Sequence, residues 1–94
     1  MEPIEFYKPL EKEFTIYSKS GCPNCKKVKE LLESSDSNFT IVDCDEYLVN
    51  SKPEFLHFIA LLSNQYWTTF PIVFEGSQFI GGFIDTRVYL SNKS

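Results

Sequence analysis

Two cysteines stand three positions apart in the stretch YSKSGCPNCKK, which runs from Tyr17 to Lys27. Paired thiols at this spacing can hold a metal ion, close a structural disulfide, or exchange electrons with a substrate disulfide. A third cysteine, Cys44, and the single histidine, His57, lie further along the chain. Which chemistry applies depends on the elements that carry Cys22 and Cys25.

The composition excludes several classes of protein. The chain has 94 residues, of which 43% are hydrophobic, and this is typical of one folded domain. A net charge of −4 argues against non-specific nucleic-acid binding, and no apolar run approaches a membrane span. The N-terminus is acidic where a signal peptide is basic, and three cysteines are too few for a secreted disulfide scaffold. We therefore expect a cytoplasmic monomer without nucleic-acid or membrane partners.

The hydrophobic pattern of the first half predicts two strands with a helix between them. Phe14–Ser18 alternates apolar and polar residues and predicts a strand. A helix starts at Pro23 and places one set of apolar residues on a common face: Val28, Leu31 and Leu32. After a polar loop at Ser34–Asn38, the run Phe39–Cys44 predicts a second strand that is nearly all buried.

The second half predicts a helix, a hairpin and a short closing helix. Ser51 and Glu54 have the spacing of a capping box, and an amphipathic stripe follows and ends near Asn64: Phe55, Phe58, Ile59 and Leu62. Two strands, Phe70–Phe74 and Gln78–Ile80, flank a turn and form the hairpin. Gly81 and Gly82 interrupt the pattern, and the closing helical turns span Asp85–Leu90.

These elements predict an α/β fold of order βαβαββα, with a four-stranded mixed sheet flanked by helices. The strand–helix–strand unit predicts two parallel strands, and the hairpin adds an antiparallel edge. Residues 1–12 are expected to form an arm or a short helix, and residues 13–94 the domain.

The cysteine pair falls where the first strand turns into the first helix. If Pro23 is the first helical residue, Cys22 lies at the positive end of the helix dipole, which stabilises a thiolate. Lys19 adds positive charge nearby. Cys25 shares the face of the first turn and is expected to be more sheltered, as a resolving thiol. This position favours redox chemistry.

Zinc is the competing interpretation. Cys22 and Cys25 can be completed by Cys44 and His57 to a Cys₃His ligand set. Cys44, however, falls in a predicted strand, whereas zinc ligands usually gather in turns. We expect Cys44 to be a small buried hydrophobe, His57 to lie on a helix surface, and no metal to be bound.

The motif resembles that of the glutaredoxins, the small glutathione-linked branch of the thioredoxin-like fold. The segment TFPIVFEGSQFIGGFID, Thr69 to Asp85, is similar to the family's Thr-Val-Pro segment, hairpin and Gly-Gly turn, in the same order. The resemblance covers about residues 14–85. It implies a glutathione-dependent oxidoreductase that reduces protein disulfides and protein–glutathione mixed disulfides.

Carried over residue by residue, the resemblance makes Cys22 the nucleophile and Cys25 the second thiol. Lys19 would face the glycine carboxylate of glutathione, Pro71 would follow a cis peptide bond, and the Phe70 backbone would pair with the cysteinyl part. The glutathione-binding set that the resemblance implies is Lys19, Thr69, Phe70, Pro71, Gly82, Phe83, Ile84 and Asp85.

The chain also departs from the family pattern. Asn24 replaces the tyrosine common between the two cysteines, and Ile84 stands where many members have Ser or Asp. The closing helix is expected to be shorter than usual. Two alternatives stay open: a [2Fe–2S] cluster held by Cys22 and glutathione between two chains, which Pro23 disfavours, and a redoxin reduced by thioredoxin reductase.

Overall fold

The structure is a computed structural model, and it describes residues 5–93. Its elements are β1 (Phe14–Ser18), α1 (Pro23–Ser34), β2 (Phe39–Asp43), α2 (Asp45–Asn50), α3 (Lys52–Ser63), β3 (Ile72–Glu75), β4 (Gln78–Gly81) and α4 (Phe83–Lys93). Within these residues the strands form one sheet of order β2-β1-β3-β4. β1 pairs with β2 in parallel, and the β1–β3 and β3–β4 pairs are antiparallel. The predicted α/β fold with a four-stranded mixed sheet is confirmed.

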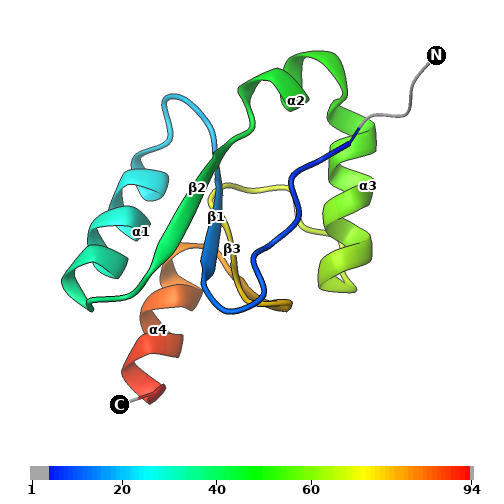
Figure 1. Ribbon diagram of the computed structural model, residues 1–94. Helices are drawn as coiled ribbons and strands as arrows, with labels where there is room; N and C mark the ends of the chain where they lie inside the picture. Colours follow the sequence, from blue (N-terminus) through cyan, green and yellow to red (C-terminus); the bar gives the residue numbers. More distant parts are fainter. Residues whose placement is uncertain (1–4, 94) are drawn as a thin grey trace.

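Helices cover both faces of this sheet (Figure 1). α1 and α4 lie on one side of it and α3 on the other. Successive side chains of β1 point to opposite faces, so Phe14 and Ile16 pack toward α1 and α4 while Tyr17 packs toward α3. Across residues 5–93, none of the helices has both the length and the apolar character that crossing a membrane requires.

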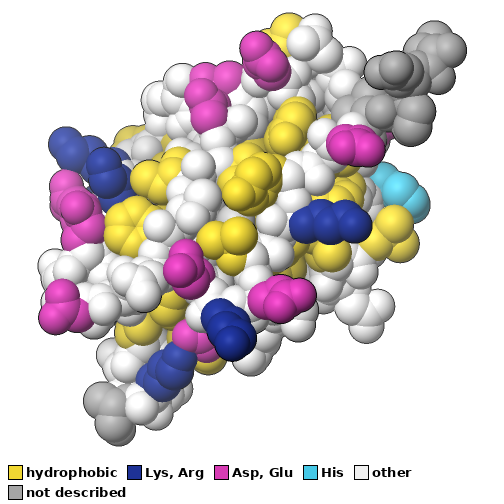
Figure 2. All heavy atoms as spheres, in the orientation of Figure 1, with side chains coloured by type: hydrophobic (Ala, Val, Ile, Leu, Met, Phe, Trp, Pro, Cys, Tyr) yellow, Lys and Arg dark blue, Asp and Glu magenta, His cyan; other side chains and the backbone are white. Residues whose placement is uncertain are grey.

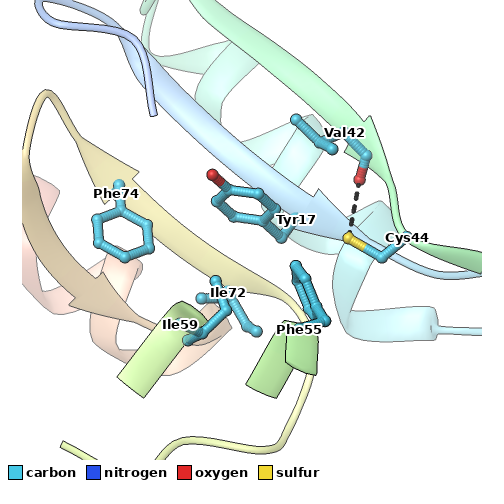
Figure 3. Packing of buried hydrophobic residues seen from close by; sticks show 7 residues of the cluster. All are labelled: Tyr17, Val42, Cys44, Phe55, Ile59, Ile72 and Phe74. Atoms are coloured by element: carbon cyan, nitrogen blue, oxygen red, sulfur yellow. Dashed lines mark hydrogen bonds between the residues drawn. The ribbon is translucent and has the colours of Figure 1, made fainter. Parts of the chain in front are cut away.

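The core on the α3 side is built around Phe55, which is fully buried (Figure 3). Its ring packs against aromatic rings of the N-terminal arm, β1, α2, α3 and the segment before β3: Phe6, Tyr17, Tyr47, Phe58 and Phe70. One side chain of α3 therefore contacts the N-terminal arm, β1, α2 and the segment before β3.

The segment before Phe14 is held on this core. Its described part, residues 5–13, contains no helix. The Phe6 ring packs edge-on against the Tyr47 ring at 4.9 Å between centroids. Both backbone groups of Tyr7 form hydrogen bonds with this core. The Tyr7 N–H donates to the Tyr47 hydroxyl at 3.2 Å, and the Tyr7 carbonyl accepts from the Tyr17 hydroxyl.

A helix that the sequence pattern did not reveal, α2, follows β2. The prediction that Cys44 lies in the second strand is wrong, because β2 ends at Asp43 and Cys44 is the N-cap of α2. The Asp43 carboxylate accepts a hydrogen bond from the Asp45 N–H at 3.0 Å, which turns the chain out of the strand. β2 is also an edge strand, so Ile41 is 42% exposed, and the prediction of a nearly all buried strand is wrong.

Two details of α3 also differ from the prediction. Ser51 is the N-cap and is buried, but its side chain makes no capping hydrogen bond, so the predicted capping box does not form. The apolar stripe is narrower than predicted, because Phe55 and Ile59 are fully buried whereas Leu62 is 36% exposed.

The boundaries of β3 and α4 are shifted from the predicted ones. β3 begins at Ile72 instead of Phe70, since Pro71 has no N–H to donate to a strand ladder. α4 begins at Phe83 and runs to Lys93, past the predicted end at Leu90. The C-terminal half of α4 is anchored on β3, where the Glu75 carboxylate accepts hydrogen bonds from the Tyr89 hydroxyl and the Lys93 ammonium.

We expect Phe55→Ala to lower the free energy of unfolding by about 3–5 kcal/mol, because it removes a buried ring and leaves a cavity. Leu61→Ala is the matched control on the same helix. Leu61 is 70% exposed, so its truncation should change stability by less than about 0.5 kcal/mol. Urea unfolding of both variants measures the difference, and equal losses would contradict this description of the core.

Candidate active site

Chain segments that are distant in sequence meet at one edge of the sheet. β1 and β2 both end there, since Ser18 pairs with Asp43. β3 begins there, since Tyr17 pairs with Ile72, and β4 ends there, since Gly81 pairs with Val73. The loop after β1, the start of α2, the segment before β3 and the start of α4 are therefore neighbours around the cysteine pair.

Cys22 is the N-cap of α1, and Pro23 is its first helical residue, as predicted. The Cys22 backbone is extended (φ −109°, ψ 101°), and its sulfur accepts a hydrogen bond from the Cys25 N–H at 3.2 Å. The sulfur thus takes the place that a serine or aspartate oxygen usually takes at a helix N-terminus. Free backbone N–H groups and the positive end of the dipole favour negative charge at this sulfur.

Cys22 and Cys25 are joined by a disulfide, with 5.3 Å between their Cα atoms. Cys22 is half-buried, whereas Cys25 is only 6% exposed. The first sulfur is therefore open to an incoming substrate and the second is sheltered behind it. The prediction that Cys25 is the more sheltered of the two is confirmed.

The loop that leads to Cys22 is fixed by Asp45, a residue that the sequence reasoning left without a role. The Ser20 N–H donates to Asp45 Oδ1 at 2.9 Å, and the Ser20 hydroxyl donates to Oδ2. The hydroxyl bond, the N–H bond and the nearby Lys19 charge all lower the pKa of Asp45. Gly21 then turns the chain with φ +69°, a region that favours glycine, and delivers Cys22 to the helix.

Lys19 and Phe70, both predicted to contact glutathione, lie together. The Lys19 ammonium is 5.4 Å from the centre of the Phe70 ring. That ring stacks on Phe55 with 6.3 Å between centroids, so the core holds it in place. Lys19 is exposed, and its charge interacts with the Asp45 carboxylate.

The other residues of the segment before β3 are held in place by burial and by a local hydrogen bond. The Phe70–Pro71 peptide bond is cis, as predicted, and Pro71 is fully buried. Thr69 is exposed, and its carbonyl accepts a hydrogen bond from Trp67 Nε1 at 3.0 Å. The Trp67 ring packs edge-on against Phe79, so this indole closes the core below the segment.

The Gly-Gly turn brings the start of α4 to Pro71. A Cβ on Gly82 would lie 3.7 Å from the Pro71 carbonyl oxygen, which shows how closely the two backbones approach. Gly81 has φ +130°, and a Cβ there would lie 2.6 Å from the Asp85 carboxylate. Asp85 accepts a hydrogen bond from the Gly82 N–H at 3.0 Å and so caps α4.

Phe83 and Ile84 form the first turn of α4, beside this glycine turn. Helix N-termini carry N–H groups without intrahelical partners, which suits the predicted carboxylate contact of these two residues. Their side chains differ, because Phe83 is half-buried and the Ile84 side chain is 54% exposed.

The zinc hypothesis finds no support in the geometry. Among residues 5–93, no group of three or more histidine, cysteine or acidic side chains is placed to hold a metal ion. Cys44 is fully buried, and its thiol donates to the Val42 carbonyl at 3.5 Å (Figure 3). Burial, with smaller contributions from Asp43 and Asp45, raises the pKa of Cys44 to about 12. His57 is exposed on α3.

A disulfide-forming cysteine pair at the strand-to-helix turn of this sheet is the arrangement of a thiol–disulfide oxidoreductase with a thioredoxin-like fold. The glutaredoxin family model matches residues 14–80, which is more than half of the chain. The chain therefore belongs to the glutaredoxin family. The family is one of thiol–disulfide oxidoreductases that use glutathione.

Solved glutaredoxin structures have the same fold. Glutaredoxin 1 from Francisella tularensis, complexed with cacodylate, is 23% identical with a TM-score of 0.73, over 85% of this chain and 93% of that one. A buckwheat glutaredoxin–glutathione complex is 22% identical with a TM-score of 0.68, over 86% and 70%. Wheat glutaredoxin is 28% identical with a TM-score of 0.68, over 86% and 71%. A comparison with curated protein sequences finds no match.

In the reduced native protein, we expect iodoacetamide near neutral pH to label Cys22 and to leave Cys44 unmodified. Cys44 is inaccessible, and a thiol with a pKa of about 12 holds only about one part in 10⁵ of thiolate at pH 7. Mass spectrometry of the digested protein assigns the label. In urea, Cys44 should react as well, which controls for its intrinsic reactivity. Labelling of Cys44 as fast as Cys22 in the native state would contradict the prediction.

The Asp45–Ser20 contact predicts an acid-sensitive contribution to stability. Because the folded pKa of Asp45 is below its unfolded value, this contribution is present above the unfolded pKa and is lost as the pH falls through the folded one. The stability difference between the wild type and Asp45→Asn should therefore shrink from about pH 5 to about pH 2. Urea midpoints at several pH values test this, with Glu46→Gln as the control in the same helical turn. A difference that stays constant over this range excludes the contribution.

Proposed function

We propose that this protein is a glutathione-dependent oxidoreductase that reduces protein–glutathione mixed disulfides and protein disulfides through Cys22 and Cys25. The observation that carries the proposal is the position of the Cys22 sulfur. It is the half-exposed N-cap acceptor of α1 and is paired with the buried Cys25. We further propose that the active form is a cytoplasmic monomer, with residues 13–94 as the catalytic domain.

Deglutathionylation then needs one protein thiolate. The Cys22 thiolate attacks the glutathione sulfur of the mixed disulfide, and the new bond joins Cys22 to glutathione. The substrate cysteine leaves as a thiolate and takes a proton from solvent. A second glutathione thiolate attacks the glutathione sulfur on Cys22, which forms glutathione disulfide and returns the Cys22 thiolate. The incoming glutathione is oxidised as the substrate cysteine is reduced, and the glutathione taken from the substrate stays at the disulfide oxidation level throughout.

Reduction of a protein disulfide uses both cysteines. The Cys22 thiolate attacks one sulfur of the substrate, and a mixed disulfide between the two proteins forms. Cys25 then attacks Cys22, releases the substrate as a dithiol and closes the disulfide that the structure contains. Two glutathiones reduce this disulfide again. The short path from Cys25 to Cys22 favours closure over escape of the mixed disulfide.

Glutathione would bind across the edge of the sheet beside Cys22. Lys19 would pair with its glycine carboxylate, and the backbone of Phe70, between Thr69 and Pro71, would hold the cysteinyl part. The γ-glutamyl carboxylate would face the Gly82 turn and the first N–H groups of α4, at Phe83 and Ile84. Asp85 would act through the turn that it caps. The similar fold of the buckwheat glutaredoxin–glutathione complex supports this assignment.

We expect Cys22→Ser to lose deglutathionylation completely, because no thiolate remains at the helix N-terminus. Cys25→Ser should keep most of this activity and lose the reduction of protein disulfides, since the resolving step is missing. The assay follows glutathione and glutathione reductase with a glutathionylated peptide and, separately, with a disulfide-bonded protein.

Two outcomes would overturn the mechanism. Activity of Cys22→Ser would exclude Cys22 as the nucleophile, and loss of deglutathionylation in Cys25→Ser would exclude the route that needs one thiol. Turnover that depends on thioredoxin reductase, with none supported by glutathione, would favour the other reductant. A glutathione-dependent brown dimer with visible absorption would favour the [2Fe–2S] alternative.

A further inference from the structure

α1 and α4 meet beside the proposed glutathione site, and the side chains along this junction have no role in the proposed function, which uses only the backbone N–H groups of Phe83 and Ile84. Lys27 of α1 and Arg87 of α4 both place their cationic groups over the Phe83 ring, each 5.8 Å from its centre. Phe83 follows Gly82, the residue that closely approaches Pro71. The surface therefore adjoins the thiol site on the side away from α2.

Exposed apolar side chains continue this surface along α4. Ile84 is 54% exposed and Val88 is 51% exposed. They lie four residues apart, so they share one exposed face of the helix, and Arg87 lies one turn after Ile84. Val88 also lines a hollow with Gln78 and Ile80 of β4. We name this set the α1–α4 surface; it consists of Lys27, Phe83, Ile84, Arg87 and Val88.

The charges on the two sides of the Cys22 loop differ in sign. α2 begins with Asp45 and Glu46, whereas the first half of α1 carries lysines. In Figure 2, acidic side chains lie over α2 at the top, and Lys and Arg side chains gather beside the upper part of α1. On the α2 side, Asp45 partly offsets the charge of Lys19. The α1–α4 side is therefore the more cationic one.

Two acidic residues lie close to the α1–α4 surface: Glu30, one turn after Lys27 on α1, and Asp85 on α4. Asp85, within the first turn of α4, is engaged by the Gly82 N–H. Lys27 and Arg87 remain as two cations over one ring, which leaves their outer sides available to an anionic partner. The whole chain has a net charge of −4, so attraction of an acidic partner is local and is screened by salt.

From these observations we propose that the α1–α4 surface docks protein substrates whose reactive cysteine is flanked by acidic and apolar residues. Acidic side chains would pair with Lys27 and Arg87, and apolar ones would cover Ile84 and Val88. The inference rests on the proposed function and specifies its substrate class. It adds no chemical step, because docking only raises the rate at which the substrate disulfide meets Cys22.

The test compares three glutathionylated peptides that differ only in the residues around the cysteine: aspartates, serines or lysines. The readout is the ratio of kcat/KM for the aspartate peptide to kcat/KM for the serine peptide. A change in the reactivity of Cys22 or in the binding of glutathione affects both peptides equally, so it cancels in this ratio. Two exposed ion pairs correspond to a preference of about two- to tenfold at low ionic strength, which should fall toward one at high salt. The lysine peptide should be the slowest.

Variants with a reversed side-chain charge test whether the α1–α4 surface is the origin of the peptide preference. Lys27→Glu and Arg87→Glu should each abolish or invert the preference, whereas Lys12→Glu, the matched control, should keep it. Lys12 lies before β1, at the end of that strand opposite Cys22, and lines a separate hollow of about 450 Å³ with Ser35 and Asn38. Val88→Ser should slow a peptide with a flanking leucine and leave the serine peptide unchanged.

The possible results separate three claims: that docking occurs, that the α1–α4 surface causes it, and that the protein uses glutathione. Equal kcat/KM for the three peptides in the wild type would overturn the docking proposal while leaving the proposed function intact. A preference that survives in both Lys27→Glu and Arg87→Glu would exclude this surface as its origin. If no peptide is turned over with glutathione, while thioredoxin reductase supports turnover, the proposed function fails, and the same ratio measured with that reductant still tests the docking.

Discussion

The pairing of β1 on both of its edges is the constraint on which the site depends. β1 bonds to β2 on one side and to β3 on the other, and its side chains fill the cores on both faces of the sheet. With both registers fixed, the residue that follows Ser18 must emerge beside Asp43 and beside the segment before Ile72. The loop that carries Cys22 is therefore held at the end of the sheet where β1 and β2 finish. The functional geometry is thus a consequence of strand register more than of the loop's own sequence.

Features with local causes could be predicted from the sequence. Pro23 fits the first turn of a helix and lacks an N–H, so it marks the start of α1 and leaves Cys22 as the N-cap. The hairpin follows from a glycine turn between two short apolar runs, and Gly76 has the positive φ that such a turn requires. The cis bond at Pro71 was expected from the resemblance and not from any local pattern.

Features with tertiary causes could not be predicted. Nothing local indicates that Asp45 bonds to Ser20, which lies 25 residues earlier, because that contact exists only once β1 and β2 are paired. α2 is a single short helix that contributes Tyr47 to the aromatic core, and its apolar pattern is too brief to identify. Cys44 ends the segment FTIVDC, whose residues favour a strand, yet the Asp43 side chain accepts a hydrogen bond from the Asp45 N–H and turns the backbone directly after β2. The cations over Phe83 likewise come from two helices that meet only in the fold.

The two halves of the candidate site rest on different faces of the sheet. The cysteines belong to α1, whose Val28 and Leu32 pack with Ile16 on the α1–α4 side. Lys19 lies over Phe70, and the Phe70 ring is held by Phe55 on the α3 side. Loosening of the α3 core would therefore displace the Phe70 ring and the lysine above it while the helix N-terminus keeps its hydrogen bond to the Cys22 sulfur. The cysteine pair and the Lys19–Phe70 pair are in this way supported by separate cores, and the β1–β3 pairing holds the two in register.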